Sequence, residues 1–297
     1  MGVLRVFGFK TGLNLVMNSL RCGHKTLELG RPAIMGIVNV TPDSFSDGGH
    51  LFSNSQLNIS KTLQLVENML LWGADIIDIG GESTRPGAVE VAPQQELDRV
   101  IPVLEAVTTR FDALVSIDTS TSAVIAEAAG RGASMINDVR ALTRDGAIEA
   151  AAESKLPVCL MHMQNQPKTM QLAPTYGDVL TEVLDFLLLR KKHCLEAGID
   201  SSQIVLDPGF GFGKTLAHNL SLFNAIDRFV DTGHPILVGV SRKSMIGELI
   251  SLKNTDDRIT GSVVMALMAA QRGAKILRVH DVRETRQAID IWESTKF

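Results

Sequence analysis

Cysteine is scarce in this sequence. Three cysteines, Cys22, Cys159 and Cys194, stand among 297 residues, and no two of them form a Cys-x-x-Cys pair. An odd count without that spacing argues against a disulfide framework and against a structural zinc site. We therefore expect the chain to work in a reducing compartment, the cytoplasm.

Charge of one sign and aromatic residues are also sparse. The 29 basic and 33 acidic residues give a net charge of -4 without a long run of either sign, and 5% of the residues are aromatic. Nucleic-acid and anionic membrane surfaces attract basic stripes or patches, so neither partner is expected. No stretch is long and apolar enough to span a bilayer, and residues 1–16 lack the apolar core of a signal peptide.

What the chain does contain is a unit of short apolar segment, polar loop and amphipathic stretch, repeated eight times. The apolar segments are residues 34–38, 75–79, 114–117, 134–136, 157–161, 203–206, 235–240 and 275–279. Helical stretches between them include residues 56–72, 94–110, 178–196 and 257–272. Gly73, Gly132 and Gly273 each precede an apolar segment, as glycines at helix C-termini do. Pro102 should kink the second of these helices or lie near its start.

Strands that alternate with helices predict a parallel sheet. Eight units in this length favour an α/β fold of one domain, the closed (β/α)8 (TIM) barrel, over a doubly wound open sheet. We assign the barrel to residues 31–297. Residues 1–30 fall outside the pattern as an N-terminal extension with a possible hairpin that closes the barrel's bottom. Met17 offers a second start, so residues 1–16 are expected to have no role in the fold.

Nearly every predicted strand ends in a polar or ionisable residue. Any one of these could be a helix cap, but together they indicate the catalytic face of a barrel, where the carboxyl ends of the strands meet. The residues are Asn39, Asp78, Asp118, Asn137, His162, Asp207, Ser241, Arg278 and His280.

The glycine-rich segment 207–215, DPGFGFGKT, matches neither common nucleotide motif. Pro208 stands where a phosphate-binding loop needs glycine, and Lys214 stands where a dinucleotide fingerprint needs one. We predict instead that the glycines let the backbone pass close to a flat ring packed against Phe212, with Asp207 at the edge of that ring.

Several features predict an anion site on the same face. Lys243 precedes a helix, where backbone N–H groups and a cation attract anions. Arg278 and His280 lie two residues apart and so face one side of a strand. Arg85 belongs to a second turn-rich loop. No three residues have transition-metal spacing, so a metal would be Mg2+ held mainly by substrate phosphates.

Eight motifs in order resemble those of bacterial dihydropteroate synthases, which join a pterin to p-aminobenzoate in the folate pathway. The first is MGIVNVTPDSFSDGG at residues 35–49. The others are DIGGESTRPG, SIDT, IND, MHM, DPGFGFGK and SRKS, followed by RVH near the C-terminus. The likeness runs from about residue 27 to the end of the chain.

This resemblance implies a role for each matching residue, and several residues have two roles. The pterin would be held by Asp118, Asn137, Met161, Asp207, Phe212 and Lys243. Pyrophosphate would be bound by Asn39, Arg85, Arg278 and His280, and Mg2+ by Asn39. The p-aminobenzoate site would comprise Thr84, Pro86, Lys243 and Ser244. The catalytic set would be Asp118, Asp207, Lys243, Arg278 and His280.

The implied reaction is an SN1-like loss of pyrophosphate from (7,8-dihydropterin-6-yl)methyl diphosphate, followed by attack of p-aminobenzoate. The chemistry suits the residues, because a carboxylate such as Asp207 can accept two parallel N–H groups from the pterin edge. The alternative is a non-catalytic or methyltransfer pterin-binding module. That module would lack the pyrophosphate and p-aminobenzoate residues, all of which are present here. The resemblance also implies a homodimer formed through the late helices.

Overall fold

The computed structural model describes residues 17–41, 52–53, 56–85 and 87–296. All eight apolar segments of the repeat form strands within one parallel sheet. In chain order the strands are β3 (Ala33–Asn39), β6 (Ile76–Gly80), β7 (Leu114–Asp118), β8 (Met135–Asp138), β9 (Val158–Met161), β10 (Ile204–Asp207), β11 (Leu237–Val238) and β12 (Ile276–Val279).

The sheet closes into a barrel. The strands follow one another around it in chain order, and β12 pairs with both β11 and β3. A parallel bridge between Leu206 and Ile236 joins β10 to the segment that leads into β11. A doubly wound sheet has two open edges, so that alternative is excluded and the predicted (β/α)8 barrel is confirmed.

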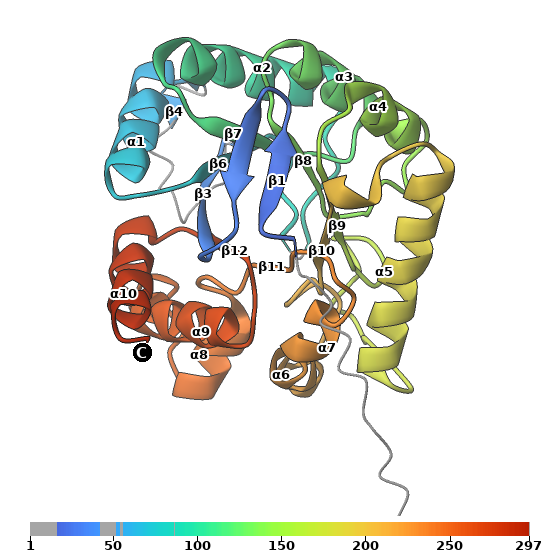
Figure 1. The fold of residues 1–297 in the computed structure, drawn as a ribbon, viewed down its shortest axis with the longest axis vertical. Helices are drawn as coiled ribbons and strands as arrows, with labels where there is room; N and C mark the ends of the chain where they lie inside the picture. The colour runs from blue at the N-terminus through green and yellow to red at the C-terminus, as the bar shows by residue number, and fades with distance from the viewer. Residues whose placement is uncertain (1–16, 42–51, 54–55, 86, 297) are drawn as a thin grey trace, which may run out of the picture.

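Helices form the outer ring around these strands (Figure 1). They are α1 (Ile59–Leu71), α2 (Pro93–Arg110), α3 (Ser122–Gly130), α4 (Ala147–Ser154), α5 (Val179–Glu196), α6 (Leu216–Asn224), α7 (Ile226–Val230), α8 (Ser244–Ile250), α9 (Ile259–Gln271) and α10 (Val282–Ser294). Short 3-10 turns, Ser201–Gln203 and Asp256–Arg258, precede β10 and α9.

Two predicted helix starts were early. The stretch 56–72 begins as a helix only at Ile59, because Gln56–Leu57 (β5) pairs with Phe52–Ser53 (β4). The Asn58 side chain then caps α1 by accepting the Lys61 N–H at 3.0 Å. The stretch 257–272 begins as an α-helix at Ile259, after a 3-10 turn. Pro102 lies well inside α2, which continues through it, and not near its start.

The helix-ending glycines are confirmed by their backbone. Gly73, Gly132 and Gly273 have φ angles of 93°, 95° and 100°. A residue with a Cβ is strained in this left-handed region. Each of these glycines lies between a helix and the strand that follows it. The repeating unit therefore uses the same type of helix-to-strand turn three times.

The two faces of the barrel wall differ. Outward residues such as Ile77 and Ile79 are fully buried in the large core between strands and helices. Inward residues near the strand starts, such as Met35 and Ile76, form a second apolar cluster with the hairpin of β1 (Ser19–Cys22) and β2 (Lys25–Glu28). Figure 1 shows this hairpin across the N-terminal end of the barrel. The polar inward residues lie near the opposite, carboxyl end.

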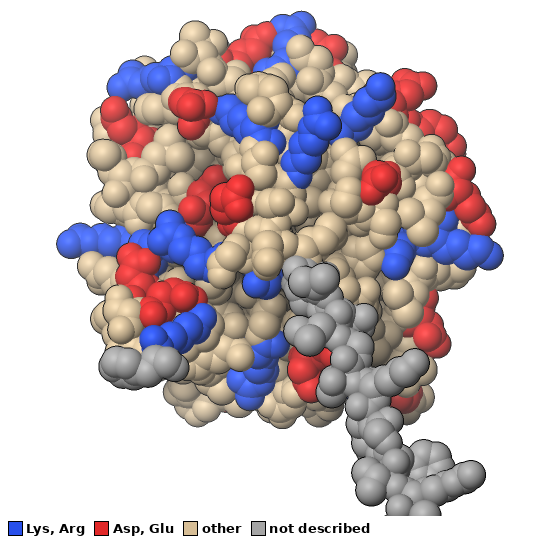
Figure 2. All heavy atoms as spheres, viewed as in Figure 1, with Lys and Arg blue, Asp and Glu red and all other residues tan. Residues whose placement is uncertain are grey.

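The surface on the hairpin side carries acidic and basic side chains interspersed over most elements (Figure 2). Among the described residues, no helix is long and apolar enough to cross a membrane. Cys22, Cys159 and Cys194 are buried free thiols. The assignment of residues 1–30 and 31–297 to separate parts remains a prediction, and residues 1–16 lie outside the described chain.

Candidate active site

A buried ion cluster lies inside the carboxyl end of the barrel. The Arg278 guanidinium donates through Nε to Asp78 Oδ2 and through Nη2 to Asp118 Oδ2, both at 2.7 Å. Asn137 Nδ2 donates to the same Asp78 oxygen at 3.2 Å. Period-two alternation turns these residues inward, and parallel register aligns Asp118 with Asn137. Four strands, β6, β7, β8 and β12, are thereby joined through side chains.

Burial governs the charges of this cluster. It raises the pKa of Asp118 to about 7, against the lowering effect of Arg278, and the nearby Asp78 carboxylate raises it further. Burial opposes the charge on Arg278, but Asp78 and Asp118 outweigh it and raise the pKa of the guanidinium. Arg278 is therefore always cationic, whereas Asp118 changes its charge near neutral pH.

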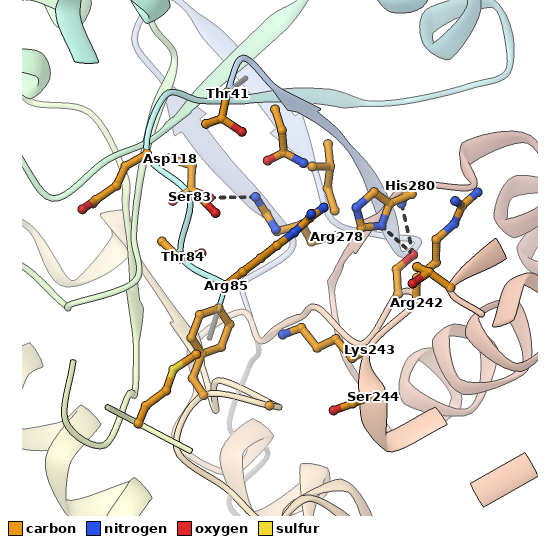
Figure 3. Close-up of a pocket in the computed structure, with 18 of the residues that line it drawn as sticks. Thr41, Ser83, Thr84, Arg85, Asp118, Arg242, Lys243, Ser244, Arg278 and His280 are labelled. Atoms are coloured by element: carbon orange, nitrogen blue, oxygen red, sulfur yellow. Dashed lines mark hydrogen bonds and ion pairs between the residues drawn. The ribbon is translucent and has the colours of Figure 1, made fainter. Parts of the chain in front are cut away.

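A cavity of about 530 Å³ opens above the cluster. Figure 3 shows Arg85 reaching across it in the direction of Arg278, with Lys243 and His280 on the opposite wall. Arg85 and Lys243 add positive charge to that of Arg278, so the cavity suits an anionic ligand. Nine of the predicted site residues line it, namely Asn39, Thr84, Arg85, Asp118, Phe212, Lys243, Ser244, Arg278 and His280.

Three predicted pterin residues lie buried beside the cavity and do not line it. Asn137, Met161 and Asp207 are 3%, 3% and 5% exposed. Met161 and Asp207 are aligned on β9 and β10. Asp207 Oδ1 accepts the Gly209 N–H at 2.7 Å, and burial raises the pKa of Asp207. Pro86, predicted for the p-aminobenzoate site, lies outside the described residues.

Lys243 joins the two sides of the site. Its ammonium lies 4.5 Å from the centre of the Phe212 ring, a cation–π distance, and it donates to the Phe210 carbonyl. Burial lowers the pKa of Lys243 to about 8, although Asp207 opposes this shift. Lys243 is the N-cap of α8, as predicted.

Two backbone donors just before this helix are already engaged. The Arg242 N–H donates to Ser262 Oγ at 2.8 Å, and the Lys243 N–H donates to the Val240 carbonyl at 3.2 Å. These two amides are therefore not available to an anion. The Lys243 side chain, which lines the cavity, can still supply that interaction.

His280 lies on the same side of its strand as Arg278, as predicted, and lines the cavity. Its backbone N–H donates to Ser241 Oγ at 3.2 Å, and its Nδ1 lies 3.1 Å from the same oxygen. Burial lowers the pKa of His280 to about 3, and Arg278 lowers it further. A neutral imidazole that accepts the Ser241 hydroxyl at Nδ1 keeps its hydrogen on Nε2, which makes Nε2 a donor for an anion.

The glycine-rich loop after β10 packs on protein backbone. Gly209 has φ of 70°, and a Cβ there would lie 1.9 Å from the His162 carbonyl oxygen. A Cβ on Gly213 would lie 2.6 Å from the Gln164 carbonyl oxygen. Glycine is therefore required because this loop packs closely against the β9–α5 loop. The sequence analysis predicted instead that the glycines let the backbone pass close to a flat ring.

The sequence analysis missed Lys214. Its ammonium is buried inside that loop and donates to the carbonyls of Gly209 and Phe212 at 2.9 and 3.1 Å. It also lies 2.9 Å from His162 Nδ1. Burial lowers the pKa of Lys214 well below its usual value. The lysine directly follows five alternating glycines and phenylalanines at residues 209–213, and this pattern is the signal that could have found it.

Asp78 is a strand-end residue to which the sequence analysis assigns no role. It precedes Gly80 by two positions and therefore faces inward with it. Its carboxylate is fully buried and holds both Arg278 and Asn137. Period-two counting back from the strand end would have found it.

Comparison with known proteins identifies the family. A profile described as "Pterin binding enzyme" matches residues 35–280. Dihydropteroate synthase of Haemophilus influenzae is 52% identical over 93% of this chain and 98% of its own length. The Escherichia coli K12 enzyme is 53% identical over 91% of this chain and 94% of its own. The chain belongs to the dihydropteroate synthase family.

Solved structures of this family agree with the barrel. Dihydropteroate synthase of Yersinia pestis, solved as a sulfonamide drug complex, superposes with a TM-score of 0.89 at 52% identity and covers 93% of this chain and 98% of its own. The Xanthomonas albilineans enzyme in complex with 7,8-dihydropteroate has a TM-score of 0.83 at 43% identity, with coverage of 93% and 98%. The predicted transferase class is confirmed by these relatives.

We expect Lys214→Met to lower the free energy of unfolding by about 2 kcal/mol, because it removes the ammonium that donates to the carbonyls of Gly209 and Phe212 inside the loop. Urea denaturation would measure the change. Lys253→Met is the matched control, since Lys253 is exposed and should shift stability by less than about 0.5 kcal/mol. Equal stability of the two variants would mean that Lys214 does not hold the loop.

Proposed function

We propose that this cavity joins (7,8-dihydropterin-6-yl)methyl diphosphate to p-aminobenzoate and releases pyrophosphate and 7,8-dihydropteroate. The observation that carries the proposal is the arrangement of buried carboxylates next to a cationic cavity. Asp118 and Asp207 accept N–H groups, whereas Arg85 and Arg278 attract phosphates. The matched relatives are dihydropteroate synthases over nearly their whole length, which favours the enzyme over a non-catalytic or methyltransfer module.

We assign pterin recognition to the side chains buried beside the cavity and to their neighbours on its wall. Asp207 accepts two parallel N–H groups of the amino-pyrimidinone edge, and Asn137, which both donates and accepts, meets a mixed edge. Asp118 accepts a further ring N–H. Met161 and Phe212 pack on the ring faces, and Lys243 donates to a ring acceptor from its place over Phe212.

The reaction begins with cleavage of the C–O bond at the pterin methylene. The bond electrons leave with pyrophosphate, and the resulting cation is delocalised over the ring and stabilised by the Asp118 and Asp207 carboxylates. The arylamine nitrogen then attacks the methylene and loses its proton. Arg85, Arg278 and the Nε2–H of His280 bind the departing phosphates. Thr84, Ser244 and Lys243 border the p-aminobenzoate, with Pro86 assigned by resemblance alone.

Mg2+ fits this site through few protein atoms. No group of three His, Cys, Asp or Glu residues suits a metal among the residues described. Asn39 places one carboxamide on the cavity wall, and Mg2+ commonly keeps waters and takes its other ligands from phosphates. Bound there, the ion would neutralise charge on the diphosphate. We infer that Asn39 contributes its side-chain oxygen.

The test is incubation of the pure protein with the pterin diphosphate, p-aminobenzoate and Mg2+, followed by quantification of both products. Dihydropteroate and pyrophosphate should form in equal amounts. Failure to form dihydropteroate would refute the proposed function.

Asp207→Asn should weaken pterin affinity at least about thirtyfold, or about 2 kcal/mol, because an amide N–H would face a ring N–H inside a buried site. Calorimetry with 6-hydroxymethylpterin would measure the dissociation constant. Asp227→Asn, at an exposed position of α7, is the matched control and should leave it unchanged. Unaltered affinity in Asp207→Asn would remove Asp207 from the pterin site.

The charges predict a narrow pH optimum. Asp118 becomes protonated below its pKa of about 7, and Lys243 loses its proton above its pKa of about 8. Both charged forms coexist mainly between these values, so kcat/KM for the pterin diphosphate should fall on both sides as apparent pKa values of the free enzyme. Asp118→Asn should abolish the acid limb of the profile. An acid limb that persists in this variant would assign it to another group.

We also propose a homodimer formed through α8 and α9. Leu249 and Ile250 of α8 and Val264 of α9 are 47%, 45% and 49% exposed, and apolar side chains of neighbouring helices support an interface. Sedimentation should show a dimer, and Val264→Glu should shift it to the monomer. A wild-type monomer would refute the interface.

We place the protein in the cytoplasm because its three thiols are free.

A further inference from the structure

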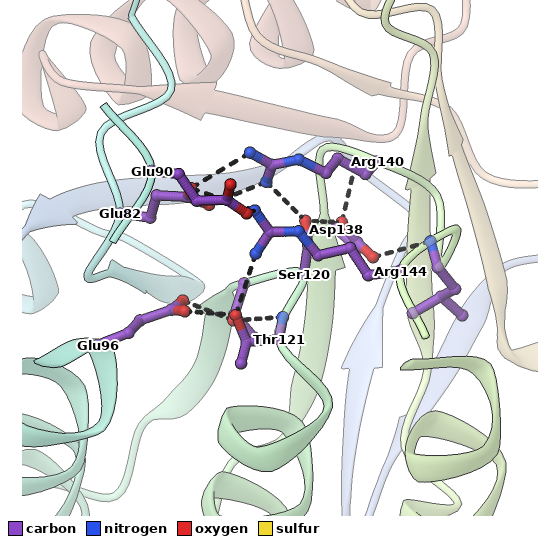
Figure 4. Close-up of polar contacts among 10 residues, drawn as sticks. Glu82, Glu90, Glu96, Ser120, Thr121, Asp138, Arg140 and Arg144 are labelled. Atoms are coloured by element: carbon purple, nitrogen blue, oxygen red, sulfur yellow. Dashed lines mark hydrogen bonds and ion pairs between the residues drawn. The ribbon is translucent and has the colours of Figure 1, made fainter. Parts of the chain in front are cut away.

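A buried ion pair lies at the base of the loop between β6 and α2. Glu82 and Arg140 have side chains that are 5% and 7% exposed. Arg140 Nη1 donates to Glu82 Oε2 at 2.9 Å, and Nη2 donates to Oε1 at 3.2 Å. This two-point contact fixes both the position and the plane of the carboxylate. Figure 4 shows the pair as part of a larger polar network.

Arg140 is itself held from the β8 side. The fully buried Asp138 accepts the backbone N–H groups of Arg140 and Leu142, both at 2.8 Å, and the hydroxyl of Ser120. Ser120 Oγ in turn accepts from Arg140 Nη1 at 3.0 Å. The Arg140 guanidinium therefore bonds to Ser120 on one side and to Glu82 of the β6–α2 loop on the other.

The turn that carries Arg140 is strained. Ala141 and Leu142, which follow it, have φ angles of 52° and 57° although neither is glycine. Left-handed backbone costs about 1 to 2 kcal/mol for each such residue and persists where the surroundings enforce it. Arg190 of α5 provides that support, because its Nε and Nη2 donate to the carbonyls of Ala141 and Leu142, both at 2.8 Å.

The loop above the pair carries site residues. Thr84 and Arg85 follow Glu82 by two and three positions and line the cavity. A residue spans at most about 3.6 Å, so fixing Glu82 confines Thr84 to a small region. The same loop is also held where Arg99 donates to the Gly81 carbonyl at 2.9 Å.

We propose that Arg140 is a positioning residue for the second substrate. Supported by the strained turn and by Arg190, it fixes Glu82 so that Thr84 and Arg85 face the cavity in the geometry that binds p-aminobenzoate. Arg140 does not line the cavity and touches no substrate. The inference rests on the proposed function for the identity of the second substrate, and on the contacts alone for the order of the loop.

Two variants test the proposal from opposite sides. Arg140→Lys keeps the charge but loses the planar two-point contact. Arg190→Met keeps both residues of the ion pair and removes the donors to the turn carbonyls, together with a contact to His193. Both should raise KM for p-aminobenzoate about tenfold, a loss of about 1.4 kcal/mol, and should leave the dissociation constant of 6-hydroxymethylpterin within about twofold. Arg131→Met, at a position 45% exposed at the C-terminus of α3, is the control and should change neither.

A measurement without substrate separates this inference from the proposed function. Amide hydrogen exchange in residues 82–90 should quicken in both variants relative to wild type and the control, because the loop opens more often. That result supports the positioning role even if wild type makes no dihydropteroate. Unchanged exchange in residues 82–90 would overturn it. A KM for p-aminobenzoate that stays at the wild-type value in Arg190→Met, despite a loss of stability, would also overturn it.

Discussion

The site depends on one cation held between two carboxylates in the interior of a barrel. Removing an ion from water is costly, and attraction offsets that cost only when every partner is well placed. Arg278 meets this condition by bridging Asp78 and Asp118 from a different strand. Two carboxylates and one guanidinium leave an excess of negative charge, which suits a ring edge that presents N–H donors and a substrate that becomes cationic.

Barrel geometry makes this cluster possible. In a closed parallel sheet, inward side chains from neighbouring strands meet in layers. The lower layers of this barrel are apolar and sealed by the β1–β2 hairpin, whereas the upper layers are polar and open into the cavity. Water can therefore reach the charged groups from one end only. This explains why burial dominates the pKa shifts of Asp118, Lys243 and His280.

A second polar network organises the loops around the cavity. The Glu82–Arg140 pair connects the β6–α2 loop to the β8–α4 turn, and Lys214 connects the β10–α6 loop to the β9–α5 loop. In both places a long cationic side chain bonds to groups of a neighbouring loop. The loops of a barrel differ among enzymes more than its strands do, and here buried side-chain contacts hold these loops to one another.

The sequence by itself determined the eight strands, the barrel and the face on which the polar residues gather. It could do so because apolar runs, terminal glycines and strand-end residues are local patterns with local causes. It also predicted nine of the residues that line the cavity, because they belong to motifs that resemble those of a known family. Only the tertiary structure decided the partners. Arg278 contacts Asp78 across a separation of 200 residues, Lys214 turns inward to bond to carbonyls, and Arg140 pairs with Glu82. Such contacts depend on the register of the strands and on the closure of the barrel. The periodicity of one segment does not specify which distant side chain will pair with a buried charge.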